Sequence, residues 1–167
     1  MIGIPEACFF TGHRVIPKKL YEQIISRLRE QILNMINRGV TVFIAGGAIG
    51  FDTLAAEQVL ALRKDYDSIK LHLYLPCRGQ DSDWREQDRD RYQRIKRRAD
   101  YIFYVTDGEY SDGCMKKRNR AMADSAEYCI AYIVNSRRSG SSQTAAMAIE
   151  KGIPVINIAD LINKDCR

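Results

Sequence analysis

Residues 40–62, VTVFIAGGAIGFDTLAAEQVLAL, restrict the fold more than any other part of the sequence. The first six of them are mostly apolar and β-branched, which is typical of a parallel strand covered on both faces. Gly46, Gly47 and Gly50 follow, and the next apolar residues recur at helical spacing. The segment therefore predicts a strand, a glycine turn and a helix.

A glycine turn at this place favours an anion. The first N–H groups of a helix lack intrahelical acceptors and carry the positive end of the helix dipole. Glycine also lets a phosphate approach the backbone closely. The pattern is not the dinucleotide-binding fingerprint, because Ala45 stands where its first glycine would be. A tight turn without a ligand explains the two adjacent glycines equally well, so the turn alone does not decide.

Strand-like and helix-like segments alternate through most of the chain. The expected strands are residues 8–10, 40–45, 69–75, 101–105, 128–134 and 154–158, and the main helices are residues 17–38, 52–62, 84–99, 115–126 and 143–151. This alternation predicts an α/β fold: a Rossmann-like three-layer sandwich, with a mostly parallel sheet of about six strands and helices on both faces. The length of 167 residues suits one domain, so we expect residues 1–167 to form a single one.

The composition is that of a globular protein. Hydrophobic residues make up 46% of the chain, mean hydropathy is −0.33, and no apolar run approaches the length of a membrane span. The first six residues have neither the basic region nor the apolar core of a signal peptide. The five cysteines form no C-x-x-C pair, which argues against a disulfide framework or a zinc site, and Cys8 and Cys129 are expected to be buried thiols. We expect a cytoplasmic protein without a metal or cofactor. A net charge of +5 does not by itself imply nucleic acid.

Polar clusters follow four of the predicted strands. Ligands of parallel sheets bind at the carboxyl ends of the strands, so these clusters are the candidate binding residues. They are Thr11, Gly12, His13 and Arg14 after the first strand, Gly46, Gly47, Ala48, Gly50 and Asp52 after the second, Arg118 and Asn119 after the fourth, and Ser139, Gly140, Ser141 and Thr144 after the fifth.

Each cluster has a binding interpretation and a purely structural one. Arg14 suits a bidentate contact with phosphate, and His13 suits either a ligand or the end of a strand. Asp52 is either a helix N-cap or an acceptor for ribose hydroxyls. Arg118 and Asn119 suit a phosphate and a base, or simply a solvated helix start. The hydroxyls after the fifth strand suit a phosphate or plain helix capping.

Five motifs run in order through nearly the whole chain. They are FTGHR at residues 10–14, GGAIGFDTLAAE at 46–57, a proline-to-tryptophan segment at 76–84, MKKRNRAMADSA at 115–126 and SGSSQTAAMA at 139–148. Together they resemble the SLOG superfamily of Rossmann-like nucleotide-binding proteins, most closely its small stand-alone bacterial members of unknown function. This resemblance implies a SLOG domain that binds a nucleotide or a nucleotide-derived ligand.

Two groups in that superfamily suggest different activities. The glycine-rich, R-N-R and S-G-S-x-x-T-A segments are similar to the DNA-processing protein of bacterial transformation, which binds single-stranded DNA. The spacing from Arg118 to Met122 resembles the cytokinin-activating phosphoribohydrolases, which split a nucleoside monophosphate and use a glutamate after a glycine turn. Here Ala146 and Met147 occupy the glutamate positions. A carboxylate there would stabilise an oxocarbenium-like transition state, so this departure argues against hydrolysis.

The sequence thus predicts binding of a nucleotide or nucleotide-derived, phosphate-bearing ligand at the C-terminal ends of the strands, as a sensor or binding module. Hydrolysis of the N-glycosidic bond of nucleoside monophosphates is the alternative, which leaves open whether the protein is an enzyme. Single-stranded nucleic-acid binding is a second alternative and is not favoured. The expected partner is a small nucleotide-like ligand, no membrane is involved, and a homodimer is compatible with the exposed helices of such a fold.

Overall fold

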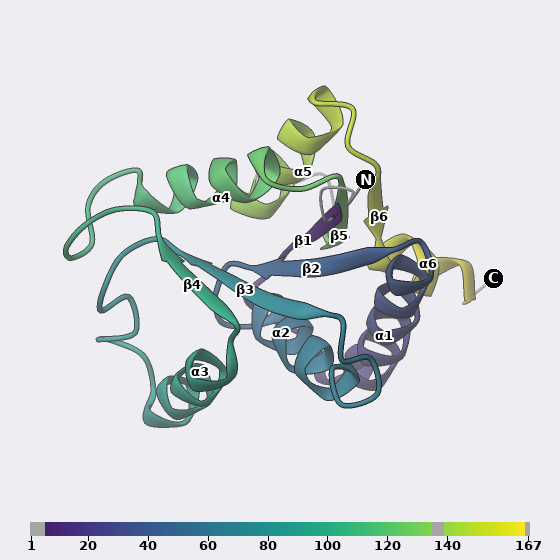
Figure 1. Ribbon diagram of the computed structural model, residues 1–167, viewed down its shortest axis with the longest axis horizontal. Helices are drawn as coiled ribbons and strands as arrows, with labels where there is room; N and C mark the ends of the chain where they lie inside the picture. The colour runs from purple at the N-terminus through teal and green to yellow at the C-terminus, as the bar shows by residue number, and fades with distance from the viewer. Residues whose placement is uncertain (1–5, 135–138, 166–167) are drawn as a thin grey trace.

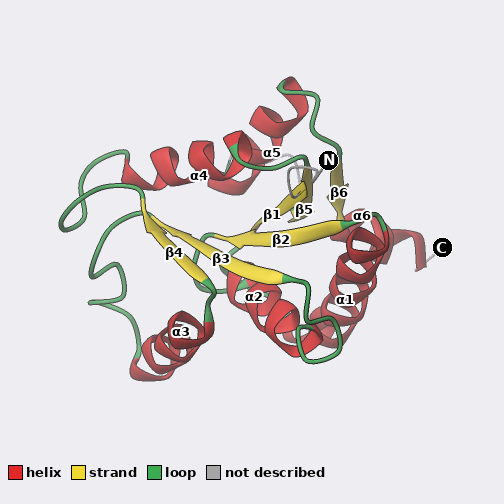
Figure 2. Ribbon diagram, viewed as in Figure 1, coloured by secondary structure: helices red, strands yellow, loops and turns green. Residues whose placement is uncertain are grey.

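The computed structural model describes residues 6–134 and 139–165, in which six strands form one sheet with helices on both faces (Figure 1, Figure 2). The strands are β1 (Glu6–Gly12), β2 (Val40–Ala45), β3 (Lys70–Leu75), β4 (Tyr101–Tyr104), β5 (Tyr128–Tyr132) and β6 (Val155–Asn157). The helices are α1 (Tyr21–Asn37), which follows the short 3-10 helix η1 (Lys18–Leu20), then α2 (Phe51–Leu62), α3 (Glu86–Arg98), α4 (Cys114–Asp124), α5 (Gly140–Glu150) and α6 (Ile158–Asp165). The predicted fold class is confirmed.

The order of the strands in the sheet is β4-β3-β2-β1-β5-β6, and every neighbouring pair is parallel. The chain moves outward from β1 to β4 and then returns, through α4, to place β5 on the other side of β1. The boundary between β1 and β5 is therefore the topological switch point of the sheet. In open α/β sheets, ligands bind in the crevice that such a reversal leaves at the C-terminal ends of the strands.

Two helical layers of unequal size cover the sheet. Helices α1, α2, α3 and α6 lie on one face, and α4 and α5 lie on the other (Figure 1). Strand β1 serves both layers, because successive side chains alternate between faces: Cys8 and Phe10 join the larger core, while Ala7 and Phe9 join the smaller one. No helix in the described part of the chain has the length and apolar character needed to cross a membrane.

Several element boundaries differ from the sequence expectation. Helix α5 begins at Gly140 and not at residue 143, because Ser139 caps it through a reciprocal bond with Ser142. Helix α3 begins at Glu86 and not at residue 84, since the preceding segment forms tight turns. Positions 135–138 of the expected loop lie outside the described residues. Cys8 and Cys129 are buried free thiols, as predicted, and burial raises the pKa of both.

The loop after β1 and the turn after β2 pass each other in direct backbone contact. The N–H of Phe51 donates to the carbonyl of His13 at 3.1 Å, which fixes the first turn of α2. Gly50 has φ 89° and ψ −122°, and a Cβ added there would stand 2.3 Å from the carbonyl oxygen of Arg14. Only glycine fits both the conformation and the space. This crossing places the end of β1 against the start of α2.

Replacing Gly50 by alanine should therefore cost far more stability than replacing Gly39, which also has positive φ but has nothing within 4 Å of its added Cβ. Backbone strain alone predicts a loss of about 1–2 kcal/mol for Gly39→Ala. Gly50→Ala adds an overlap with main-chain atoms, so we expect at least about 3 kcal/mol in total. Denaturant unfolding of the two variants measures this difference. Equal losses would contradict the close approach.

Candidate ligand-binding site

A cavity of about 290 Å³ opens at the end of β1, at the switch point of the sheet. Its walls come from the segments after β1 and β2, from α4 and from the start of α5. Four stretches that are far apart in sequence therefore meet in one place. Eleven of the predicted site residues line this cavity: Thr11, Gly12, His13, Arg14, Ala48, Asp52, Arg118, Asn119, Ser139, Gly140 and Ser141.

The three glycines of the β2 turn are not among the residues that line the cavity. A Cβ on Gly46 would stand 2.7 Å from the guanidinium of Arg118, and one on Gly47 would stand 2.4 Å from the side chain of Leu75. Gly47 also accepts a hydrogen bond from Gln80 at 3.3 Å. These glycines make room for the protein's own atoms, so their presence in the sequence is explained without a phosphate.

A buried guanidinium joins two walls of the cavity. Arg118, only 5% exposed, reaches from α4 to the end of β2, where its Nη1 donates to the carbonyl of Gly46. Its Nε donates to Oδ1 of Asn119 at 2.7 Å, and its Nη2 contacts the sulfur of Met115 at 3.6 Å. Arg118 thus links α4 to the end of β2. Three of its five N–H donors already contact protein atoms.

Asp52 supplies the matching negative charge. A Cβ added to Gly46 would lie 2.8 Å from Oδ2 of Asp52 as well as close to the guanidinium of Arg118. The same Oδ2 accepts the N–H of Ala48 at 3.3 Å. Burial raises the pKa of Asp52, and the charge of Arg118 and the N–H of Ala48 oppose that rise. Burial likewise lowers the pKa of Arg118, which Asp52 opposes. Both side chains are buried, and their opposite charges partly compensate one another.

The first turn of α5 presents free donors to the cavity. Ser139 and Ser142 satisfy each other in the capping box, and the hydroxyl of Ser141 donates to the carbonyl of Gly12 at 2.7 Å. The N–H groups of Gly140 and Ser141 have no acceptor among the described residues. Two unpaired N–H groups at the positive end of a helix dipole form an environment that suits an anion.

The remaining polar groups surround these donors. Arg14 is exposed, lines the cavity and adds a positive charge to it. His13 is partly committed to structure, because its Nε2 accepts the N–H of Val134 at 2.8 Å. Thr144 is buried and lies outside the cavity, where its hydroxyl donates to the carbonyl of Gly140 at 2.8 Å. Thr144 therefore supports the first turn of α5.

Sequence reasoning missed the apolar part of the site. Phe10, Met115 and Met122 line the cavity, and Met115 precedes Arg118 by three residues on the same face of α4. Helical spacing from Arg118 could have found both methionines. A second hollow, a groove of about 610 Å³ between α4 and α5, was also missed because it depends on how two helices pack. Its lining includes Met115, Asn119 and Gly140, which it shares with the cavity.

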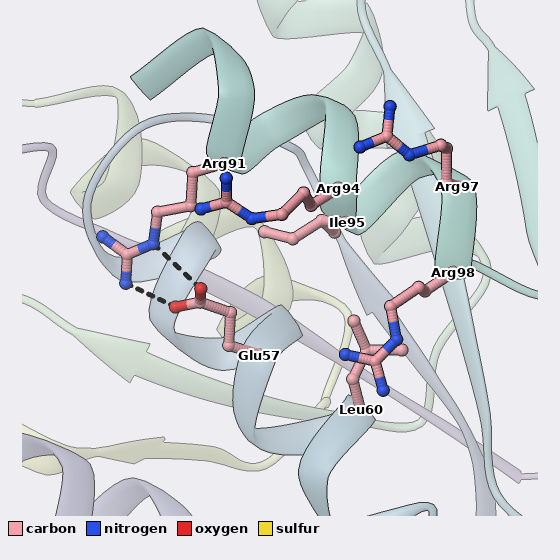
Figure 3. Close-up of a pocket in the computed structure, with 7 residues that line it drawn as sticks. All are labelled: Glu57, Leu60, Arg91, Arg94, Ile95, Arg97 and Arg98. Atoms are coloured by element: carbon pink, nitrogen blue, oxygen red, sulfur yellow. Dashed lines mark hydrogen bonds and ion pairs between the residues drawn. The ribbon is translucent and has the colours of Figure 1, made fainter. Parts of the chain in front are cut away.

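A further hollow of about 300 Å³ lies on the other layer, between α2 and α3 (Figure 3). Four arginines of α3 surround it, and Glu57 is the single carboxylate in its lining, paired with Arg91. None of the predicted site residues is among those that line it. Arg97 and Arg98 lie in the last turn of α3, where the helix dipole favours positive charge, and Arg91 is paired with Glu57, so three of the four arginines are accounted for without a ligand. No three His, Cys, Asp or Glu side chains in the described ranges are grouped to hold a metal ion.

The parallel sheet, its switch point and the cavity built there define a Rossmann-like α/β protein with a candidate site at the strand ends. The chain belongs to the YspA SLOG family, whose model matches residues 12–153. A UPF0398 protein of Halalkalibacterium halodurans is 35% identical over 104 residues, which is 61% of this chain and 51% of the relative. One of Bacillus cereus is 25% identical over 132 residues, which is 78% of this chain and 72% of the relative. The chain thus matches about half the length of the first relative.

Solved structures show the same fold. DNA processing protein A from Helicobacter pylori has a TM-score of 0.63 at 20% identity, over 96% of this chain and 73% of that one. The protein of the same name from Streptococcus pneumoniae has a TM-score of 0.62 at 20% identity, over 90% and 49%. The Helicobacter pylori protein is described by its single-stranded DNA binding mode. At this identity the likeness establishes the fold alone.

The charges of Asp52 and Arg118 should be coupled in stability. Asp52→Asn removes the negative charge that opposes the burial penalty of the Arg118 guanidinium, so we expect a loss of more than about 1 kcal/mol. Arg118→Met leaves the carboxylate in the same position. The double variant removes both charges, so its loss should be clearly smaller than the sum of the two single losses. Urea unfolding of the unaltered protein, the two single variants and the double variant gives the coupling energy. Additive losses would contradict the coupling of the two charges.

Proposed function

We propose that the protein binds a nucleotide or nucleotide-derived ligand through a phosphate at the start of α5, and that it acts as a sensor or binding module. The observation that carries this proposal is that the N–H groups of Gly140 and Ser141, which border a cavity at the switch point of a parallel sheet, have no acceptor within residues 6–134 and 139–165. Anions bind at such helix starts in many folds, and nucleotides bind at such crevices.

The other walls of the cavity fit the rest of a nucleotide. Arg14 at the mouth offers a planar guanidinium to a phosphate. The Oδ1 of Asn119 accepts from Arg118, and its Nδ2 has no acceptor among the described residues, so Asn119 offers a donor to a sugar or base. Phe10, Met115 and Met122 supply apolar surface to the same hollow. Family membership supports this assignment, since SLOG domains resemble nucleotide-binding Rossmann domains.

The donors of the α5 turn can be tested one at a time. Gly140 is the first residue of the helix, Ser139 before it is extended with φ −132° and ψ 166°, and a Cβ on Gly140 meets nothing within 4 Å. Proline is therefore accommodated at this position and removes the N–H without breaking the helix. We expect Gly140→Pro to weaken ADP binding at least ten-fold in calorimetric titration.

Gly140→Ala is the matched control, because alanine keeps the N–H and should keep the affinity within about two-fold. Both variants should unfold at similar denaturant concentrations, because an added Cβ meets nothing within 4 Å and the first position of a helix tolerates proline. Undiminished ADP affinity in Gly140→Pro would remove the α5 turn from the proposal.

Hydrolysis of a nucleoside monophosphate remains the alternative enzymatic function. Asp52 is the only carboxylate among the residues that line the cavity, and it is engaged with Ala48 and Arg118. Asp124, the other carboxylate considered from the sequence, pairs with Lys151 at the far end of α4. A group that already neutralises a buried guanidinium is poorly suited to stabilise a developing cation at C1′.

We therefore expect no release of adenine above the uncatalysed level when the protein is incubated with AMP, as followed by chromatography. Turnover in the ordinary enzymatic range of about 1–10³ s⁻¹ would establish the alternative. Loss of that turnover in Asp52→Asn, with binding retained, would assign the chemistry to Asp52.

Single-stranded nucleic acid is the second alternative. It is favoured by the likeness in fold to a protein described by its single-stranded DNA binding mode, and by Lys116 and Arg120 in the groove beside the cavity. A strand would need a continuous basic surface with bases stacked along it. Its signature is an affinity that falls steeply with salt, which separates it from a single bound nucleotide.

A further inference from the structure

The cavity and the α4–α5 groove are two hollows with a common border. Met115, Asn119 and Gly140 line both of them. The cavity alone, at about 290 Å³, is just below the range of roughly 300–1,000 Å³ for ligand pockets. The groove, at about 610 Å³, adds about twice that volume. A ligand that filled only the cavity would leave the larger hollow empty.

The unpaired donors lie at this border. Gly140 belongs to both linings, and its N–H has no acceptor among the described residues. An anion held there faces the cavity on one side and the groove on the other. The organic group of a terminal phosphate would occupy only one of the two hollows. A phosphate group with an organic substituent on each side would occupy both.

The lining of the groove suits a nucleoside, because it combines apolar and amide side chains with basic ones. Met115 and Met147 are its apolar part, and methionine side chains adapt well to flat rings. Asn119 and Gln143 supply amide groups for hydrogen bonds. Lys116 and Arg120 also line the groove, and neither has an ion-pair partner among the described residues.

We propose that the ligand is two-headed: a pyrophosphate-linked dinucleoside, with its diphosphate at the start of α5, one nucleoside in the cavity and the other in the groove. This inference rests on the proposed function, because it needs a phosphate at the same turn. It adds the class of ligand, which the cavity alone does not define. Lys116 and Arg120 then stand beside the second phosphate.

Three ligands separate this inference from simple nucleotide binding. AMP and ADP have one nucleoside, whereas diadenosine diphosphate has two. ADP carries more negative charge than diadenosine diphosphate, so charge alone ranks ADP as the tighter ligand. We expect the opposite order in calorimetric titration at fixed ionic strength, with diadenosine diphosphate at least ten-fold tighter than ADP. This comparison uses the unaltered protein, and the order of the two affinities decides between a ligand with one nucleoside and a ligand with two.

A pair of variants on α5 locates the second nucleoside. Ala146 is exposed and lines the groove, so Ala146→Trp should fill it and cancel the preference for the two-headed ligand. Ile149→Trp is the matched control, because Ile149 is 64% exposed on the same helix and is not among the groove residues. The control should keep the preference. Circular dichroism checks that both variants are folded.

Each other outcome has a definite meaning. If AMP or ADP binds and diadenosine diphosphate binds no more tightly, the two-headed ligand is wrong and the proposed function stands. If none of the three binds, both fail. If a short oligodeoxyadenylate binds more tightly than diadenosine diphosphate, with affinity that grows with its length and falls steeply with salt, the groove serves a nucleic-acid strand and the inference is overturned.

Discussion

The arrangement of the site depends on one buried guanidinium that crosses the end of the sheet. Helices α2 and α4 lie on opposite faces of the sheet. The side chain of Arg118 connects α4 to the turn that precedes α2. This reach is feasible because Gly46 has no side chain and because Asp52 balances the charge. A buried charge without such a partner would cost several kcal/mol. The position of α4, and with it one wall of the cavity, follows from these three residues.

The same arrangement bears on what the site can do. Arg118 and Asp52 are the buried charged residues that line the cavity, and the charge of each opposes the effect of burial on the pKa of the other. The groups left for a ligand are main-chain N–H groups, an exposed arginine and an amide. Such groups bind the ground state and the transition state of a phosphate ester about equally well, which favours recognition over catalysis. This division supports a binding module more than a hydrolase.

The sequence predicted the fold from features that act locally. Alternating strands and helices required a parallel sheet, and polar residues after four strands pointed to one edge of it, where the cavity lies. What it could not predict depends on contacts between distant segments. The reason for Gly46 is a side chain from 72 residues further along the chain, and the α4–α5 groove arises from the packing of two helices. The sequence alone pointed to ligand contacts as the reason for the turn glycines, whereas the structure places protein atoms against the Cβ positions of Gly46, Gly47 and Gly50; a ligand at this turn stays a prediction.

The two layers of the fold differ in how firmly they are held. Helices α1, α2, α3 and α6 share a large core with the sheet, whereas α4 and α5 rest on a small one that consists mostly of alanine, methionine and a few larger side chains. Regions with less buried apolar surface open at lower free-energy cost than the global unfolding reaction. The cavity has walls from both layers, so we expect the half formed by α4 and α5 to open at a lower free-energy cost than the half formed by the segments after β1 and β2. A ligand that bridges the halves would stabilise the weaker layer, and occupancy would then be communicated to the outer surface of α4 and α5 as a change in their order.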